Sequence, residues 1–474
     1  MKKKYIPNRY ICYLYFLIPF IVNVFISYSS NEDIWYVMKY GKSILENGFM
    51  HIDFLSIHPN LHIVIQQSFS NILFYEIYHF LGSYGFFLLC VIMIALYLFL
   101  LYKICMMLSH KNILLSILLS IITVVLLEFS YITPRPQLFT YFHLLLILYI
   151  MEDYHFNSSK MIYFLPVISL LQINLHAALW PSIFLFILPT VAEMILKKDK
   201  RVWKILGMMV LMFLVGFINP YTYENVFFSI ITYDSRINSV ITELMPLSLV
   251  SPEKSVVIYS IAFYGILAFI LLIYMYYKKG KLELRHLFLL GGTTILALTN
   301  VRSIAFFLLG SIYPLASYLK DIKWKVRDEF VDTKWYFLVI GVFILVLGAF
   351  HPNRLTSSVY QGGEYLKTHY DKDIVLYTPF GYGSYVEYLG YHSYMDTRAE
   401  VFLKKANHQE DIFIEAMNME KTCMNYREFI QKYQFDVMTV GKNSCFYYYL
   451  KQDQQKIVFE DTDYVIFEIG ELNV

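Results

Sequence analysis

The sequence predicts a mainly α protein, a polytopic bundle of about 11 transmembrane helices with a small C-terminal α/β domain. Of the 474 residues, 57% are hydrophobic and only 16% are charged, whereas soluble globular proteins carry about 25% charged residues. Aromatic residues reach 18%, as is typical where many helix ends lie at membrane interfaces. This composition excludes disordered, collagen-like and disulfide-rich chains. No basic cluster on a soluble face indicates nucleic-acid binding.

Eleven apolar stretches are candidate spans, each of which needs about 20 mostly apolar residues. They are 10–28, 84–105, 112–129, 138–151, 161–176, 179–196, 205–219, 256–277, 287–299, 303–319 and 335–350. Several are short, so their flanks are needed to complete a crossing. The first resembles a signal peptide in its basic start, but no small-residue cleavage site follows, so we interpret it as a helix.

The distribution of basic residues predicts the orientation. Of the 39 lysines and arginines, 21 fall on the side of the N-terminus and 6 in the loops of the opposite side. Cytoplasmic loops carry the excess of basic residues. We therefore expect a multi-pass protein of the cell membrane with a cytoplasmic N-terminus. An odd number of spans then places the C-terminal domain outside the cytoplasm.

Two polar regions stand apart from the spans. Residues 29–82 form a long first extracytoplasmic loop within a membrane domain that covers residues 1–353. Residues 354–474 are long enough for a core of their own, and we expect them to form an extracytoplasmic α/β domain. Strands are predicted at 373–377, 435–440, 456–459 and 464–467, with helices near 364–369, 411–419 and 426–433.

The five cysteines are too few for a disulfide framework. Cys12, Cys90 and Cys105 lie in predicted spans and are expected to be packing residues. Cys423 and Cys445 both lie in the C-terminal domain. A bridge between them is left open, because a sequence does not define whether their geometry allows it.

Polar residues beside the spans are unevenly distributed between the two sides. Such residues are costly in a bilayer and are functional candidates by default. The outer helix ends carry Glu32, Asp33, Arg135, Asn174, His176, Asn219, Glu243, Asn300 and Arg302, whereas the inner ends carry mainly lysines. The pattern predicts a polar cavity that faces the outer side.

The first outer loop begins with a predicted amphipathic helix. Ile34, Val37, Met38, Gly41 and Leu45 fall on one helical face, and Asn47-Gly48 is a stop signal. Glu32 and Asp33 lie at its start, where acids favour the helix dipole and Ser30 is a candidate cap. The functional alternative is that Asp33 is a general base that takes a proton from an acceptor hydroxyl beside a lipid-borne donor.

Arg135 and Arg302 also allow two interpretations. Each can reach lipid headgroups, or their planar guanidinium groups can bind a phosphate or diphosphate leaving group. His176 alone is more often a packing histidine than a functional one. The histidines of the first loop, His51, His58 and His62, fit no standard zinc spacing. A divalent cation, Mg²⁺ or Mn²⁺, held by Glu32 or Asp33 is left open.

Nucleotide-binding motifs are absent from the sequence. It contains neither GxxxxGK[ST] nor a strand-borne GxGxxG. This argues against an ATP-driven pump and against a transferase that uses a cytosolic nucleotide sugar. In the tail, Asp396 and Arg398 are expected to form a local salt bridge or turn, and Phe380-Gly-Tyr-Gly383 is too short for a phosphate loop.

Several segments carry a resemblance to a known group of proteins. They are NEDIWYVMKYGKSILENGFMHIDFLS after the first span, QQSFSNILFYEIYHFLGSYGF, RPQLFTY, INLHAALWPS, FINPYTYEN, NVRSIAFF and, in the tail, FGYGSYVEYLGYHSYMDTRAE. Over nearly its whole length the chain resembles bacterial polytopic membrane proteins related to GT-C-fold glycosyltransferases. The resemblance implies a helical bundle with an active site on its outer face and a polyprenyl-phosphate sugar as donor.

The resemblance also implies roles for particular residues. The catalytic acid falls on Asp33, with Glu32 beside it, and the second acidic position of the loop falls on Asp53. Phosphate or sugar contacts are implied for Arg135, His176 and Arg302, and Asn219 and Glu243 complete the predicted substrate-binding set. One departure is that Ile-Trp-Tyr-Val follows Asp33, so the histidine of a D-x-W-W-H-like run is missing.

The leading hypothesis is an inverting glycosyltransferase of the cell membrane. It would move a sugar from a polyprenyl-phosphate donor to a surface glycan, a lipid-linked glycan or a protein, with Asp33 as general base and no certain cofactor. Two alternatives are open: a transporter or flippase for a lipid-linked glycan, and a non-catalytic membrane assembly protein. Neither alternative breaks a glycosidic bond.

Overall fold

The computed structural model describes residues 8–26, 32–129, 131–238, 240–247, 255–279, 283–321, 329–350, 355 and 357–471. Two compact units are present. Unit 1 comprises Met1–Ser27, Ser83–Thr222 and Asp234–Asn353, and unit 2 comprises Tyr28–Gly82, Tyr223–Tyr233 and Arg354–Val474. The basic residues 2–4, the candidate cap Ser30 and the domain boundary at Arg354 lie outside the described residues.

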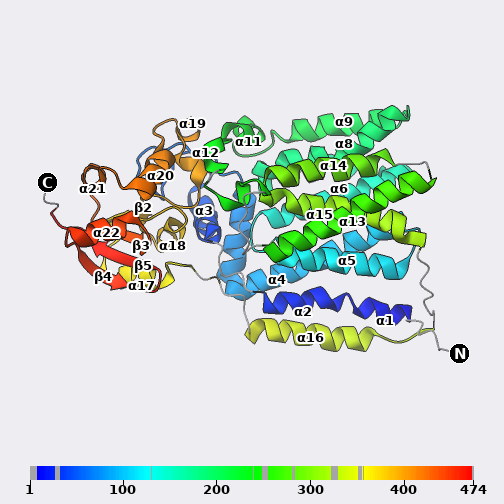
Figure 1. Cartoon of the computed structure of the whole chain (residues 1–474), viewed down its shortest axis with the longest axis horizontal. Helices are drawn as coiled ribbons and strands as arrows, with labels where there is room; N and C mark the ends of the chain where they lie inside the picture. Colours follow the sequence, from blue (N-terminus) through cyan, green and yellow to red (C-terminus); the bar gives the residue numbers. More distant parts are fainter. Residues whose placement is uncertain are drawn as a thin grey trace. The chain divides into compact units, whose positions relative to one another are not determined.

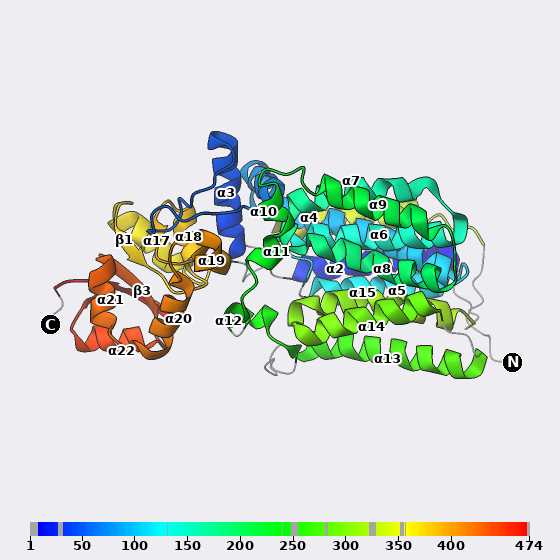
Figure 2. The same cartoon turned by 90° about the horizontal axis from the view of Figure 1, so that it is seen from above.

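Unit 1 is a bundle of long helices that lie side by side with roughly parallel axes (Figures 1 and 2). They are α1 (Arg9–Leu14), α2 (Leu17–Phe25), the second part of α4 (Ser68–Leu108), α5 (Ile113–Glu128), α6 (Gln137–Asn157), α7 (Leu165–Leu175), α8 (Trp180–Leu196), α9 (Val202–Val215), α13 (Ser255–Lys279), α14 (Leu284–Thr299), α15 (Ile304–Tyr318) and α16 (Lys334–Phe350). Each of the predicted apolar stretches coincides with one of these helices, except that the stretch 10–28 covers both α1 and α2.

Four helices of the described residues are long and apolar enough to cross a membrane: Ser68–Leu108, Ala177–Leu196, Val257–Lys278 and Val301–Tyr318. Further apolar helices, such as Ile113–Glu128 and Lys334–Phe350, have 10–17 residues. The predicted class of a helical membrane protein is confirmed. The number of eleven spans stays a prediction, because helix length alone does not define which short helices cross.

Glycines allow the helices of unit 1 to approach closely. A Cβ on Gly265 of α13 would lie 1.9 Å from the Phe307 ring of α15. A Cβ on Gly348 of α16 would lie 2.1 Å from the Phe87 ring of α4. Membrane helices lack a hydrophobic driving force toward one another, so close packing at small residues holds them together.

Unit 2 contains a mixed five-stranded sheet. Its strands are β1 (Val375–Tyr377), β2 (His392–Ser393), β3 (Val437–Gly441), β4 (Lys456–Glu460) and β5 (Tyr464–Glu468), in the order β2-β1-β3-β5-β4. β1 is parallel to β2 and β3, whereas β5 is antiparallel to β3 and β4. Four strands match the predicted ones, and β2 was missed because two residues carry no alternation.

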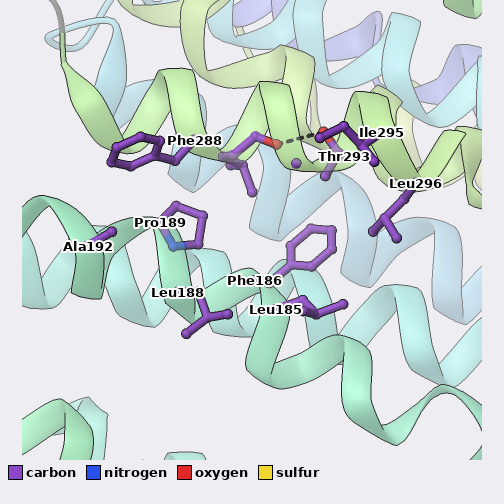
Figure 3. Close-up of a pocket in the computed structure, with 11 residues that line it drawn as sticks. Leu185, Phe186, Leu188, Pro189, Ala192, Phe288, Thr293, Ile295 and Leu296 are labelled. Carbon is purple, nitrogen blue, oxygen red and sulfur yellow. Dashed lines mark hydrogen bonds between the residues drawn. The ribbon is translucent and has the colours of Figure 1, made fainter. Parts of the chain in front are cut away.

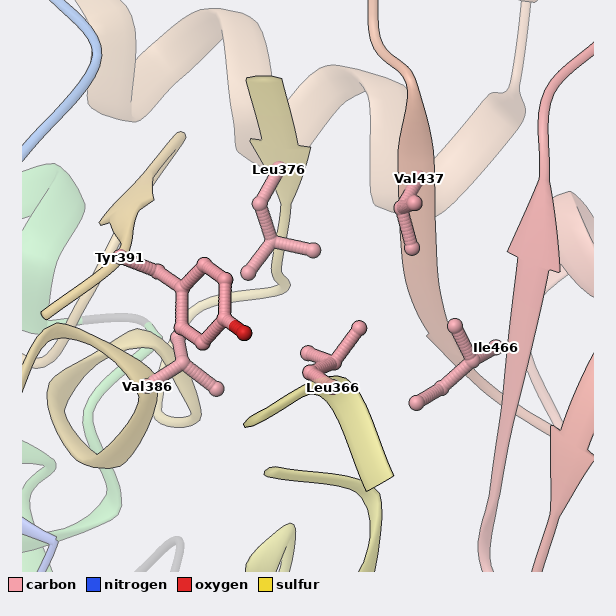
Figure 4. Packing of buried hydrophobic residues seen from close by; sticks show 6 residues of the cluster. All are labelled: Leu366, Leu376, Val386, Tyr391, Val437 and Ile466. Carbon is pink, nitrogen blue, oxygen red and sulfur yellow. The ribbon is translucent and has the colours of Figure 1, made fainter. Parts of the chain in front are cut away.

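Helices cover both faces of this sheet. Leu376 of β1, Val437 of β3 and Ile466 of β5 pack on Leu366 of α17 (Tyr360–His369) and Val386 of α18 (Gly383–Tyr388), as Figure 4 shows. Neighbouring residues of a strand point to opposite faces. Accordingly, Tyr377 contacts aromatic rings of α21 (Tyr426–Tyr433) and α22 (Cys445–Gln452).

The first outer loop belongs to unit 2 and extends its sheet. Ser56 pairs with Ser393 of β2 in a parallel bridge, and the Ile57 amide donates to the Ser393 carbonyl at 2.9 Å. The predicted division into residues 1–353 and 354–474 assigns this loop to the membrane domain, but the loop makes backbone hydrogen bonds with the tail. The short helices α10 (Tyr223–Val226) and α11 (Phe228–Ile231) join the same unit.

The predicted amphipathic helix is α3 (Asp33–Asn47), which ends at Gly48 with φ of 82°. Trp35 packs on Tyr385 and Tyr388 of the α18 region, with ring centroids 4.8 and 5.1 Å apart. The predicted buried face is confirmed except at its end. Leu45 is 50% exposed and Ile44 is buried in its place, because the face follows the α18 surface.

Cys423 and Cys445, whose pairing the sequence left open, form a disulfide bond. It joins the end of α20 (Ile412–Thr422) to the first residue of α22. A bridge that closes a loop of this length stabilises a fold by roughly 3 kcal/mol in the chain-entropy account. Cys12, Cys90 and Cys105 are buried and take no part in a disulfide bond within the described part of the chain.

Candidate functional site

Two predicted arginines of unit 1 meet on one carboxylate. Arg135 Nη1 donates to Glu243 Oε1 at 2.9 Å, and Arg302 Nη2 donates to Glu243 Oε2 at 2.8 Å. The side chains of Arg135 and Arg302 are 22% and 31% exposed, so both reach solvent. Burial would raise the pKa of Glu243, but the two guanidinium groups lower it to about 2. The carboxylate is therefore ionised, and the three charges sum to one positive charge.

Local turns place these arginines. Pro134 and Pro136 flank Arg135, and proline fixes the backbone before α6 begins at Gln137. Asn300 accepts hydrogen bonds from both the amide and the hydroxyl of Ser303, which closes the turn that carries Arg302. The Val301 amide donates to the Met245 carbonyl at 3.0 Å, which ties this turn to the segment of Glu243.

His176 is buried in unit 1, and its ring lies within the electrostatic reach of the Arg302 charge. Its Nδ1 is 2.8 Å from the Thr140 hydroxyl. Gln172 donates to both the Thr140 hydroxyl and the His176 carbonyl, each at 2.9 Å. These bonds fix the histidine as a buried group rather than an exposed one.

Asn219 has a local structural role. Its amide group donates to the carbonyls of Gly216 and Thr222, at 2.8 and 2.9 Å, and its oxygen accepts from the Tyr221 amide. It therefore holds the turn that follows α9. Its predicted contact with substrate stays a prediction.

The predicted catalytic acids lie in unit 2. Asp33 is the first residue of α3, where a negative charge favours the helix dipole. Glu32 accepts hydrogen bonds from Ser357 Oγ at 2.9 Å and from the Ser358 amide at 2.9 Å. Burial raises the pKa of Glu32, and these bonds offset part of the rise. Glu32 thus anchors the start of α3 to the segment of Ser357 and Ser358.

Asp53 belongs to a buried charge network of unit 2. Arg398 Nη1 donates to Asp53 Oδ1 at 2.6 Å, and Arg398 Nε contacts both carboxylate oxygens of Asp396 at 2.9 Å. The expected local Asp396–Arg398 salt bridge is confirmed. Burial would raise the pKa of Asp53, but the Arg398 charge and hydrogen bonds lower it to about 2. Its pairing links the first loop to the tail.

Sequence reasoning missed a polar pocket in unit 2. His62 Nε2 lies 2.8 Å from Glu224 Oε1, and Glu400, Lys405 and His408 line the same hollow of about 290 Å³. These residues come from three distant segments of the chain. The one signal in the sequence for their proximity is that all three segments are predicted to lie on the outer side. Among the described residues, no group of three His, Cys, Asp or Glu side chains is arranged to hold a metal ion.

A larger hollow of about 350 Å³ lies between α8 and α14 of unit 1 (Figure 3). Phe186, Pro189, Phe288 and Leu296 point into it, and its Thr293 hydroxyl donates to the Leu289 carbonyl of its own helix at 2.7 Å. The lining offers no group for sugar or phosphate chemistry. The chemical candidates are therefore the Arg135–Glu243–Arg302 cluster and the polar pocket.

The fold of the chain matches known proteins, although its sequence does not. No known protein family matches the sequence, and neither does any curated protein. Solved structures do match it, and they share the GT-C fold of membrane glycosyltransferases. The predicted relation to this fold is confirmed.

Two of these structures are of the Archaeoglobus fulgidus oligosaccharyltransferase. The form tethered to an acceptor peptide with the NVT sequon aligns with a TM-score of 0.61 at 11% identity, over 94% of this chain and 70% of that one. The apo form aligns with a TM-score of 0.57 at 12% identity, over 93% and 70%. ArnT from Cupriavidus metallidurans aligns over 97% of both chains at 11% identity, with a TM-score of 0.49.

Proposed function

We propose that the protein is a membrane glycosyltransferase that moves a sugar from a polyprenyl-phosphate donor to an acceptor on the outer side of the cell membrane. The observation that carries the proposal is the meeting of Arg135 and Arg302 on Glu243, at loops of a GT-C fold. The acceptor is a surface glycan, a lipid-linked glycan or a protein. The acceptor peptide of the archaeal structure supports the inclusion of proteins.

The donor's phosphate suits the arginine cluster. One net positive charge remains after Glu243 has paired with both guanidinium groups, and the side chains of Arg135 and Arg302 are 22% and 31% exposed. Planar guanidinium groups bind phosphate oxygens through paired hydrogen bonds. Donors that are fixed before the reaction stabilise charge as it grows on a leaving group. Glu243 holds both arginines in place for this task.

The proposed step is a single displacement at the anomeric carbon. Asp33 takes the proton of the acceptor hydroxyl as the acceptor oxygen forms a bond to that carbon. The bond from the anomeric carbon to the phosphate oxygen breaks, and its electron pair leaves with the phosphate. Arg135 and Arg302 stabilise the added negative charge. The attack from the opposite face inverts the anomeric configuration.

Chain topology supports an outer location for unit 2. From its first segment to residues 223–233, the described chain passes through six long helices, the unit 1 part of α4 and α5 to α9. From there to the tail it passes through four, α13 to α16. Since each of these helices is a predicted span, the even numbers return the chain to the same side, opposite the basic loops. The Cys423–Cys445 bond fits an oxidising, extracytoplasmic compartment.

The test is transfer by the purified protein in lipid nanodiscs. Mass spectrometry would follow a polyprenyl-phosphate hexose with and without added acceptor. The Asp33→Asn variant should fold normally and lose at least about 100-fold in turnover, because the base is removed. Glu46→Gln is the matched control, since Glu46 is an exposed acid on the same helix.

Equal turnover in the Asp33→Asn and Glu46→Gln variants would remove the proposed base. Donor that crosses the bilayer unaltered, when the wild-type protein is reconstituted in proteoliposomes and supplied with acceptor, would instead support a flippase. Donor that is neither consumed nor moved would support an assembly protein.

A further inference from the structure

The polar pocket of unit 2 is built from segments far apart in the chain. His62 lies in the first outer loop, Glu224 is the second residue of α10, and His408 directly follows α19 (Lys404–Asn407). The His62 amide donates to the Asn407 carbonyl at 3.2 Å, and the His62 and His408 rings lie 5.2 Å apart. The His62–Glu224 contact joins the first segment to the second. The pocket is thus fixed by bonds among its own walls.

The acids and the lysine of the pocket give it no surplus of positive charge. Glu224 and Glu400 stand against Lys405, and Glu224 Oε1 lies 2.8 Å from His62 Nε2. Arginine is absent from its lining residues. Phosphate and carboxylate ligands favour sites with surplus positive charge. The lining therefore suits an uncharged ligand with several hydroxyl groups, which donate to the carboxylates and accept from histidine and lysine.

Two aromatic side chains contribute to the apolar surface of the pocket. Phe228 is buried in the wall, whereas Tyr223 is exposed at 59%. Sugar rings combine hydroxyl edges with C–H faces, and binding sites combine apolar rings with a few polar groups. The volume of about 290 Å³ is at the small end of ligand pockets. It accommodates about one or two sugar rings.

The pocket shares part of its charge environment with the proposed base. Glu400, one of its walls, follows Arg398 by two residues and lies within the electrostatic reach of Asp33. A ligand held by the pocket therefore lies in the same unit and the same charge environment as the acid that must accept its proton.

We propose that this pocket binds a neutral hexose unit of the acceptor glycan. The inference rests on the proposed function, because it names the acceptor class of the same transfer. Among the acceptors considered above, it favours a surface or lipid-linked glycan over a protein. The pocket holds the sugar by its hydroxyl groups and by the faces of Tyr223 and Phe228, and it takes no part in the bond changes.

The experiment is saturation-transfer NMR with the full-length protein in lipid nanodiscs, since glycoside detergents would compete for the pocket. The probes are the methyl glycosides of glucose, galactose, mannose and N-acetylglucosamine. At least one should bind, with affinity about tenfold lower in Tyr223→Ala, as for loss of a central aromatic contact. The matched control is Tyr233→Ala, because Tyr233 is exposed in the same segment and lies outside the pocket.

A second matched pair is Lys405→Ala, which should weaken binding, and Lys404→Ala, which should not, since Lys404 is exposed outside the lining. The inference is overturned if none of the glycosides binds, if Tyr223→Ala and Tyr233→Ala bind equally, or if glucuronate or inorganic phosphate binds more tightly. These results do not depend on turnover. Binding that is kept while Asp33→Asn transfers normally would refute the proposed base and leave the sugar pocket standing.

Discussion

Arg398 lies at the centre of the buried charges of unit 2. Its guanidinium group contacts Asp53 and Asp396 and donates to the Tyr40 hydroxyl, and it is 2% exposed. Burial, followed by the nearby Asp396 carboxylate, raises the pKa of Glu387 and favours its neutral form. A buried ion that loses its partner destabilises a fold strongly, whereas a complete network does not. The network therefore makes the first loop and the tail interdependent.

Asp53 makes the stability of unit 2 depend on acidity. Its pKa falls from 3.8 to about 2 on folding, so the folded state is favoured by ionisation. This contribution, about 2 kcal/mol, is present above pH about 4 and is lost as the pH falls through the folded pKa. Asp53→Asn should destabilise unit 2 by about 3 kcal/mol at pH 7 and show a weaker pH dependence between pH 4 and 2. Thermal unfolding followed by intrinsic fluorescence measures both, and parallel pH curves for the variant and the wild type would contradict the assignment.

Arg302 is the second single residue whose role can be tested. Arg302→Gln should lower kcat/KM for the donor by about 100-fold, as removal of a fixed donor to a developing charge does elsewhere. Arg236→Gln is the matched control and should leave kcat/KM unchanged, because Arg236 is an outer-loop arginine that pairs with a different acid, Asp234. Steady-state kinetics with varied donor distinguishes them, and similar losses in both variants would indicate a general effect of charge.

At the scale of elements, the position of α3 depends on a glycine crossing. A Cβ on Gly41 would lie 2.1 Å from the Asn71 carbonyl oxygen of α4. Gly41→Ala should therefore force the two helices apart and destabilise unit 2 by about 1–3 kcal/mol, as overpacking does. Gly207→Ala is the control, because nothing lies within 4 Å of its added methyl group and alanine favours a helix interior. The melting temperature and turnover should fall only in Gly41→Ala.

Elements with strong periodicity could be predicted from the sequence. The apolar runs, α3 and the strands around Val375, Val437 and Tyr464 carry their own patterns, and the structure has them at nearly the same residues. Elements defined by tertiary contacts could not be predicted. β2 has two residues and exists because β1 and the first loop pair with it. The end of the buried face at Ile44 depends on α18, which the pattern does not contain.

At the scale of the whole molecule, the candidate site could be predicted in part. The sequence indicates Arg135, Arg302 and Glu243 because polar residues in or beside membrane spans are costly and are functional candidates by default. It does not indicate that Glu243 binds both arginines, or that Arg398 pairs with Asp53, since both depend on segments that only folding brings together. One unit gathers residues 28–82, 223–233 and 354–474. The even number of helices between these segments allows this, because it returns the chain to the same side of the membrane.

The central claim is that glycosyl transfer takes place on the side of the membrane that holds unit 2. The most direct measurement uses proteoliposomes of defined orientation, with a polyprenyl-phosphate hexose in the bilayer and a membrane-impermeant glycoside acceptor on one side only. The account predicts glycosylated acceptor only when the acceptor shares the compartment of residues 357–471. Product formed from an acceptor confined to the side of the N-terminus would contradict it.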